Sequence, residues 1–188
     1  MPFQILDRPL PGVVVLQPDA YADERGLFVE SFRADRFLEM GLPATFVQEN
    51  QSTSRRGVIR GLHFQWEPPM GKLMRVTRGR AFLVGVDIRK DSETLGRWFG
   101  LEASDEDRIQ VWAPAGFARG FSALEDGTEV LYKCTGTYDP RHESGIRWDD
   151  PRIGIRWPVK DPLLSQKDRA AQSLDDWLRR PESKHFKV

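Results

Sequence analysis

The stretch Lys72-Leu73-Met74-Arg75-Val76-Thr77-Arg78-Gly79-Arg80-Ala81-Phe82-Leu83-Val84-Gly85-Val86-Asp87-Ile88 contains two apolar, β-branched runs separated by Arg78-Gly79. Runs of this length and composition are typical of β-strands, so we expect strands at 72–77 and 81–88. Arg78-Gly79 suits a tight turn, because glycine tolerates the backbone angles that such turns need. The segment therefore predicts two strands joined by a tight turn.

The same pattern continues on both sides of this segment. Further strands are expected at 13–16, 27–32, 45–48, 58–64, 98–101, 109–112, 116–124 and 128–135. Helical signal is sparse: one short helix is expected at 34–40, ending at Gly41, and another from Ser173-Asp176 through 178, opened by a capping pair. No helix of crossover length separates the central strands, which disfavours a parallel sheet. About ten short strands at this spacing predict an all-β sandwich or jelly-roll barrel.

The overall composition narrows the class of protein. The 188 residues fit a single domain, predicted over 1–188 with its core at about 12–178 and a polar, mobile tail at 181–188. Lys and Arg total 28, as do Asp and Glu, which argues against a nucleic-acid-binding or membrane-surface protein. A single cysteine excludes an intrachain disulfide, and no signal-peptide pattern opens the chain. These features predict a cytoplasmic protein.

His63 is the strongest candidate for acid–base chemistry. The other two histidines, His142 and His185, fall in polar segments that we expect to be exposed. Alternation along the predicted strand places His63 on one face with Gly61 and Gln65, opposite the apolar Leu62 and Phe64. Imidazole titrates near neutral pH, so this histidine is either a working base or a hydrogen-bonded core residue.

The residues around this histidine favour an anion site over a metal site. Arg25, Arg60, Lys72 and Arg119 lie in or beside predicted strands, where an unpaired cation is costly. A cluster of cations there suits an anion such as a diphosphate, the alternative being simple solvation at the surface. A metal site on a barrel needs closely spaced histidines, and the residue two after His63 is Gln65, so no catalytic metal is expected.

Other reactive side chains carry weaker signals. Cys134 alternates with Thr135 and Lys133 and has no histidine nearby in sequence, so a buried structural thiol is the better prediction than a nucleophile. Tyr132 and Tyr138 have either a packing role or a functional role. Most strand tyrosines pack in the core with a hydrogen-bonded hydroxyl.

Several segments along the chain form a specific pattern when they are taken together. They are Asp23-Glu24-Arg25-Gly26-Leu27-Phe28-Val29-Glu30, Phe46-Val47-Gln48-Glu49-Asn50-Gln51-Ser52, Gly57-Val58-Ile59-Arg60-Gly61-Leu62-His63-Phe64-Gln65, Gly71-Lys72-Leu73, Val86-Asp87-Ile88-Arg89, Gly116-Phe117-Ala118, Leu131-Tyr132-Lys133-Cys134-Thr135 and Ser165-Gln166-Lys167-Asp168. In this order they resemble the dTDP-4-dehydrorhamnose 3,5-epimerase family. The resemblance implies a double-stranded β-helix, a cupin-like jelly-roll barrel with a few short peripheral helices. It also implies a homodimer in which strand 13–16 pairs with the second subunit.

The resemblance further implies an isomerase of deoxysugar biosynthesis that acts on a dTDP-linked 4-keto-6-deoxy sugar without a cofactor. By this resemblance His63 is the base, Asp168 polarises it, Tyr132 is the acid and Lys72 stabilises the enolate. The residues expected to bind substrate are Arg25, Phe28, Glu30, Gln48, Glu49, Asn50, Arg60, Lys72, Arg119, Tyr138, Glu143 and Lys167. Among them, Arg60 matches a diphosphate contact and Tyr138 an aromatic that stacks on thymine.

Two positions depart from the family pattern and leave the reaction open. Arg119 stands where the family usually has histidine, and Leu83 where it often has aspartate. Arginine stays protonated and cannot titrate as imidazole does. The resemblance favours epimerisation at C3 and C5 of dTDP-4-dehydro-6-deoxy-D-glucose, giving dTDP-4-dehydro-L-rhamnose. The alternatives are a mono-epimerase acting at one of these carbons and a non-catalytic carbohydrate-binding barrel.

Overall fold

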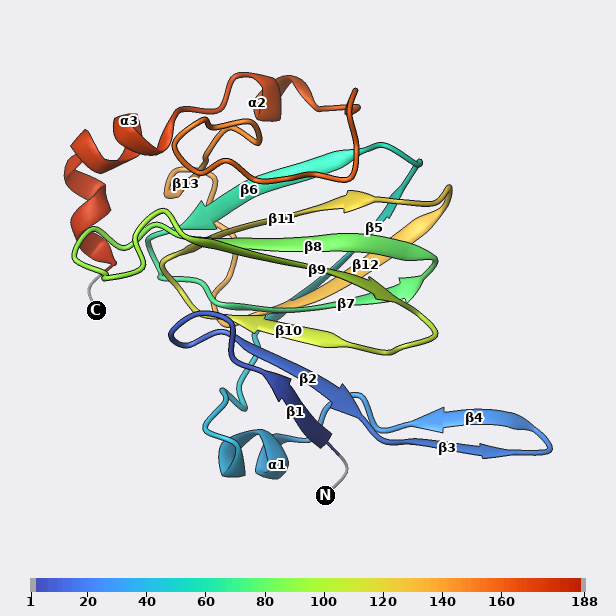
Figure 1. Cartoon of the computed structure of the whole chain (residues 1–188). Helices are drawn as coiled ribbons and strands as arrows, with labels where there is room; N and C mark the ends of the chain where they lie inside the picture. The colour runs from blue at the N-terminus through green and yellow to red at the C-terminus, as the bar shows by residue number, and fades with distance from the viewer. Residues whose placement is uncertain (1–2, 187–188) are drawn as a thin grey trace.

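Two antiparallel β-sheets pack face to face in the computed structural model, which describes residues 3–186 (Figure 1). The first sheet has the order β1 (Phe3–Asp7), β2 (Val14–Pro18), β10 (Gln110–Ala113), β7 (Lys72–Arg78), β12 (Thr128–Cys134) and β5 (Gln48–Ser54). The second has the order β13 (Glu143–Gly145), β6 (Ile59–Gln65), β11 (Phe117–Ala123), β8 (Arg80–Asp87) and β9 (Trp98–Ser104). The architecture confirms the predicted all-β, cupin-like fold.

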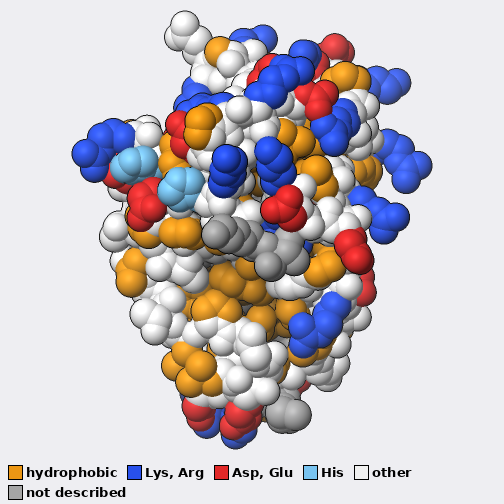
Figure 2. All heavy atoms as spheres, turned by 90° about the vertical axis from the view of Figure 1, so that its left-hand side faces the viewer, with side chains coloured by type: hydrophobic (Ala, Val, Ile, Leu, Met, Phe, Trp, Pro, Cys, Tyr) orange, Lys and Arg blue, Asp and Glu red, His pale blue; other side chains and the backbone are white. Residues whose placement is uncertain are grey.

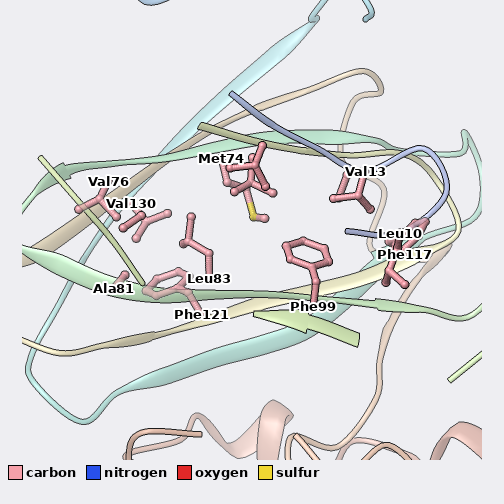
Figure 3. Packing of buried hydrophobic residues seen from close by; sticks show 14 residues of the cluster. Leu10, Val13, Met74, Val76, Ala81, Leu83, Phe99, Phe117, Phe121 and Val130 are labelled. Carbon is pink, nitrogen blue, oxygen red and sulfur yellow. The ribbon is translucent and has the colours of Figure 1, made fainter. Parts of the chain in front are cut away.

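The main hydrophobic core lies between the two sheets. Met74 of β7 and Leu83 of β8 point toward each other across it, together with Phe99 and Phe121 (Figure 3). Because successive strand residues face opposite sides, the neighbours of these residues are buried elsewhere. Leu73, for example, packs in a second cluster on the outer face of the first sheet.

Short helices cover the outer faces of both sheets. Helix α1 (Ala34–Glu39) buries Phe37 against Leu16 and Trp112 of the first sheet. On the second sheet, α3 (Leu174–Arg179) buries Trp177, whose ring lies 4.5 Å from that of Phe64. The strands between these layers are buried on both sides, which explains their nearly continuous apolar runs. Helix α2 (Gln166–Arg169) and the 3₁₀ helix η1 (Pro181–His185) complete this layer.

Most predicted strands and both predicted helices are confirmed, and β5 is the main displacement. The sequence predicted a strand at 45–48, whereas β5 spans Gln48–Ser54. Its residues are polar because one face of β5 is exposed and the other borders a cavity, so no apolar run marks it. Strands β1, β3 and β13 were not predicted.

The C-terminal residues 181–188 were predicted to be a mobile tail, but Phe186 is only 4% exposed and packs against Phe64 and Trp177. Residues 187–188 lie outside the described part. The pairing of strand 13–16 with a second subunit stays a prediction. Within the chain, β2 already has β1 on one edge and β10 on the other. The outermost strand of this sheet is β1.

A hairpin projects from the sandwich. It consists of β3 (Ala20–Asp23) and β4 (Gly26–Val29), and it extends beyond the edges of both sheets (Figure 1). Its apolar side chains are uncovered: Phe28 is 69% exposed, and Tyr21 and Leu27 are also exposed. An aromatic hairpin that packs on nothing in its own chain is a candidate contact surface.

The surface carries both signs of charge. On the face shown in Figure 2, basic and acidic side chains lie side by side above an area richer in hydrophobic side chains. Within residues 3–186, no helix is both long and apolar enough to cross a membrane.

Candidate active site

A cavity of about 390 Å³ opens among strands of both sheets. His63 of β6 and Arg119 of β11 come from the second sheet, and Lys72 of β7 and Tyr132 of β12 come from the first. Asp168 of α2 lies on its outer wall. The volume is in the range of small-molecule sites, and all four residues predicted to be catalytic line it.

His63 and Asp168 form a fixed pair. Nε2 of His63 lies 2.6 Å from Oδ1 of Asp168. The other carboxylate oxygen accepts a hydrogen bond from the Ser165 hydroxyl at 2.8 Å. Although burial alone raises the pKa of Asp168, the hydrogen bonds from His63 and Ser165 outweigh it and lower that pKa. The ionised carboxylate selects the tautomer with hydrogen on Nε2, which leaves the Nδ1 lone pair as the base.

Local sequence explains how Asp168 reaches this position. Ser165 caps α2, and its side chain accepts a hydrogen bond from the backbone N–H of Asp168. The cap therefore places the carboxylate in the first turn, where a negative charge is favourable. Sequence reasoning missed Ser165 as a site residue. The signal was present, because Ser165 and Asp168 have the same spacing as the capping pair Ser173 and Asp176.

Glycines bring His63 and Arg119 together across β6 and β11. These two residues are paired in register. Next to them, a Cβ on Gly61 would lie 2.6 Å from the Cα of Gly120, and Gly61 has a φ of +135°. Only glycine fits such a close backbone approach with this dihedral angle. The strands thus meet closely where both polar side chains enter the cavity.

Lys72 and Tyr132 occupy the opposite wall. The Lys72 Nζ lies 4.7 Å from the centroid of the Tyr132 ring. Burial, and secondly the charge of Arg119, lower the pKa of Lys72 to about 8. Burial also raises the pKa of Tyr132. At neutral pH the lysine is therefore a cation and the tyrosine keeps its proton, which suits an electrostatic stabiliser and an acid.

Arg119 is a buried cation without a carboxylate partner among residues 3–186. It is 3% exposed, and its Nη1 donates to the carbonyls of Met70 at 2.7 Å and Ala113 at 3.3 Å. Its Nε and Nη2 have no partner. Burial lowers the pKa of Arg119 to about 10, so it remains charged at neutral pH. Leu83 lies in the main core opposite Phe121 and supplies no counter-charge.

A second cavity, of about 90 Å³, adjoins the first. His63, Lys72 and Tyr132 line both. The remaining predicted residues in its wall are Gln48, Asn50, Tyr138 and Glu143. The side chain of Gln48 donates to Asn50 at 3.1 Å and accepts from the backbone N–H of Tyr138 at 2.8 Å, which fixes this wall.

Two further predicted cations lie along the main cavity. Arg60 donates from Nε to the Ser54 hydroxyl at 3.1 Å and from Nη2 to the Thr53 carbonyl at 3.2 Å. Lys167 forms an ion pair with Glu143. Arg60, Lys72 and Lys167 therefore place positive charge at three positions along the cavity wall.

Four predicted residues do not reach either cavity of the same chain. Glu49 faces the other side of β5 from Gln48 and Asn50, because strand residues alternate, and it pairs with Lys133. Arg25 and Phe28 lie on the projecting hairpin, where Arg25 pairs with Asp23. Glu30 follows that hairpin and lies 3.9 Å from Arg33.

Two other kinds of chemistry at such a site would use a bound metal ion or a nucleophilic cysteine. Residues 3–186 contain no cluster of three or more His, Cys, Asp or Glu side chains suited to hold a metal ion. Cys134 is a free, buried cysteine, and burial raises the pKa of its thiol. A protonated, inaccessible thiol is a poor nucleophile.

Comparisons with known proteins show which sequences and structures this chain is similar to. A family model described as dTDP-4-dehydrorhamnose 3,5-epimerase matches residues 7–176. The chain is 52% identical over 170 residues to the dTDP-4-dehydrorhamnose 3,5-epimerase of Methanothermobacter thermautotrophicus, covering 89% of this chain and 92% of that one.

Solved structures are similar over nearly the whole chain. The dTDP-6-deoxy-D-glucose-3,5-epimerase of Legionella pneumophila, in complex with dTDP-4-keto-L-rhamnose, matches with a TM-score of 0.93 and 41% identity, covering 99% of this chain and 100% of that one. A 3′-monoepimerase of Streptomyces bikiniensis, in complex with dTDP-quinovose, matches with a TM-score of 0.84 and 34% identity, covering 89% and 86%.

Proposed function

Since the chain belongs to the dTDP-4-dehydrorhamnose 3,5-epimerase family, we propose that it epimerises dTDP-4-dehydro-6-deoxy-D-glucose at C3 and C5, giving dTDP-4-dehydro-L-rhamnose. The observation that carries the proposal is the cavity in which the His63–Asp168 pair, Tyr132 and Lys72 meet. These residues are a base, an acid and a fixed positive charge, the set that this isomerisation requires.

The ketone at C4 acidifies the C–H bonds on either side of it. Nδ1 of His63 removes one of these protons, and the electron pair moves onto the ketone oxygen to form an enolate. The ammonium group of Lys72 stabilises this oxyanion. Tyr132 then donates its proton to the same carbon from the other face, and the configuration inverts. The reaction needs no redox step and no cofactor.

Preorganisation comes from the hydrogen bonds behind the base. The Ser165 hydroxyl donates to the Asp168 carboxylate and accepts from the Asp168 backbone N–H, so the carboxylate that holds the imidazole is itself fixed. Its negative charge also stabilises the imidazolium that forms when His63 takes the proton. The pair is therefore ready before substrate arrives.

The nucleotide end of the substrate would lie among the remaining polar residues. Arg60 and Lys167 offer cationic groups for the diphosphate. Tyr138, which is about half exposed, offers a ring face for thymine outside the small cavity. Glu143 lines the small cavity together with Tyr138 and His63.

A homodimer accounts for the hairpin residues. Arg25, Phe28 and Glu30 do not line the main cavity of their own chain. If they bind substrate, they do so in the cavity of a second copy, and two-fold symmetry makes such an exchange reciprocal. A cytoplasmic location is part of the same proposal and fits the free thiol of Cys134.

Arg119 supports a second candidate, a mono-epimerase. Its buried charge replaces the imidazole expected there, and the matched structures include a 3′-monoepimerase. Such an enzyme would invert C3 or C5 alone.

Deuterium exchange distinguishes these activities. We expect protein incubated with dTDP-4-keto-6-deoxy-D-glucose in D₂O to give deuterium at both C3 and C5 by NMR, and His63→Ala to give none. Deuterium at a single carbon would establish the mono-epimerase. No exchange by folded wild-type protein would contradict both, and binding of dTDP would then show whether the substrate or the catalytic assignment is at fault.

A further inference from the structure

Inversion at two carbons poses a proton problem that the small cavity can solve. Each inversion moves one proton onto His63 and one proton off Tyr132. The pair is then an imidazolium and a phenolate, which can neither accept nor donate in the next inversion. The two groups must be reset, and between the first and second carbon the sugar still occupies the main cavity.

The 90 Å³ cavity connects these two groups by a separate route. Both His63 and Tyr132 line it, together with the polar side chains of Gln48, Asn50 and Glu143. At ~30 Å³ for each water molecule, it has room for about three waters. It therefore offers a polar connection between base and acid that does not pass through the main cavity.

Glu143 is the carboxylate in the wall of this cavity. Its Oε2 accepts hydrogen bonds from Lys167 and, at 3.4 Å, from the Tyr138 hydroxyl. Among the described residues, nothing donates to its Oε1. Its side chain is 11% exposed, and it also borders a third cavity, of about 340 Å³, that reaches His63 from the Asp168 side. One end of Glu143 is anchored, and the other is free to take up a proton.

We propose that Glu143 relays the proton from His63 back to Tyr132 through the small cavity after each inversion. The imidazolium of His63 loses a proton, water carries it to the Glu143 carboxylate, and the carboxylic acid passes it on to the Tyr132 phenolate. The relay ends with neutral imidazole, ionised Glu143 and neutral tyrosine, so no proton is gained or lost. Glu143 touches neither reacting carbon in this role and acts through Tyr132 and His63.

The relay deepens the proposed function and depends on it. It matters most for an enzyme that inverts two carbons in one binding event, because product release cannot reset the pair in between. Removing the relay should therefore slow the second inversion and spare the first.

Single-turnover kinetics of Glu143→Gln test this. With excess enzyme and dTDP-4-keto-6-deoxy-D-glucose in D₂O, the rates of the two inversions are measured within the same bound complex, so any change in substrate binding affects both alike. The second inversion should slow by about 10²-fold, the usual contribution of a positioned proton-transfer group, so that a mono-epimerised sugar accumulates. Glu129→Gln, at a carboxylate that accepts from Gln51 on the other side of β12, is the matched control.

Chemical rescue separates a relay from a structural role. In Glu143→Ala, added formate should restore the second inversion in proportion to its concentration, because a small carboxylate can enter the space and carry the proton. Equal slowing of both inversions, no slowing in Glu143→Gln, or no rescue by formate would overturn the relay.

Deuterium exchange by the wild-type protein distinguishes failure of the proposed function from failure of the relay. If wild-type protein exchanges no deuterium, the proposed function fails and the relay with it. If it inverts one carbon only, the relay predicts that Glu143→Gln gives a burst of one turnover followed by a slow steady state. A wild type that inverts both carbons while Glu143→Gln behaves identically leaves the function intact and removes the relay alone.

Discussion

The catalytic cavity and the β3–β4 hairpin differ in how their functional side chains are held. In the cavity, His63 is fixed by Asp168, which is fixed in turn by Ser165. On the hairpin, Arg25 has 85% of its side chain exposed and pairs only with Asp23, two residues away. The contrast shows that the cavity side chains are fixed by contacts between remote segments of one chain, whereas the hairpin side chains are largely exposed and contact near neighbours.

The largest expected effect falls inside the cavity. His63→Ala should lower kcat by about 10²–10⁴-fold, because no other described residue that lines the cavity is a histidine. His185→Ala is the matched control, since that ring lies near Glu67 and away from the cavity. Coupled NMR assays of both variants at saturating substrate measure the effect. Retained activity in His63→Ala would remove the base assignment.

The hairpin should affect binding more than chemistry. Phe28→Ala removes an aromatic side chain that is exposed in one chain, so the stability of that chain should hardly change. If a second copy uses it, the Kd for dTDP should rise about 10-fold, equivalent to ~1.4 kcal/mol. Calorimetric titration with dTDP measures this, and an unchanged Kd would place Phe28 outside the site.

Subunit mixing makes the comparison between the two regions sharper. At substrate concentrations well below KM, mixing His63→Ala chains with Arg25→Ala/Phe28→Ala chains should give up to about one quarter of wild-type activity, more than either variant alone. Half of the dimers are then mixed, and one of their two sites is intact. A hairpin that serves its own chain would give no such recovery. Light scattering on the same samples establishes whether the protein is a dimer.

Arg119 should affect the pH dependence rather than the maximal rate. The nearby charge of Arg119 contributes to lowering the pKa of Lys72 to about 8, so kcat/KM should fall above pH 8 as Lys72 loses its charge. Histidine at position 119 is neutral at that pH, so Lys72 keeps its proton to higher pH. We expect Arg119→His to raise kcat/KM at pH 9, relative to pH 7, by about threefold. If Arg119→His has the same fall in kcat/KM above pH 8 as wild type, the charge of Arg119 does not affect the protonation of Lys72.

The smallest effect is expected for Cys134. Its thiol is buried and protonated, so Cys134→Ser should leave kcat within about twofold of wild type and cost about 1 kcal/mol of stability. Thermal unfolding and steady-state assays measure both. A large loss of kcat would give the thiol a role in catalysis.

The sequence predicted the parts of the molecule that obey a local rule. Apolar, β-branched runs placed Met74 and Leu83 in strands, and both lie in the core. Alternation also put His63 on the face opposite Leu62 and Phe64, as observed. Strands β5 and β13 escaped prediction because their polar residues border cavities or solvent, so they lack an apolar period.

Other features depend on distances between remote segments, which no local pattern encodes. The burial of Phe186 depends on Phe64 and Trp177, which lie far from it in sequence. The separation of Arg25 and Phe28 from the cavity depends on the direction in which the hairpin leaves the sandwich (Figure 1). Glu49 lies one residue from Gln48 and Asn50 along β5, so its side chain is on the opposite face of the strand from the cavity.

The pairing of His63 with Asp168 has a consequence for synthesis of the protein. The two residues are 105 positions apart, and the imidazole emerges from the ribosome long before its carboxylate is translated. Ser165 and Lys167 of the cavity wall arrive equally late. A nascent or prematurely terminated chain can therefore hold the strands of both sheets and still be inert. Translation itself delays activity until the chain is nearly finished.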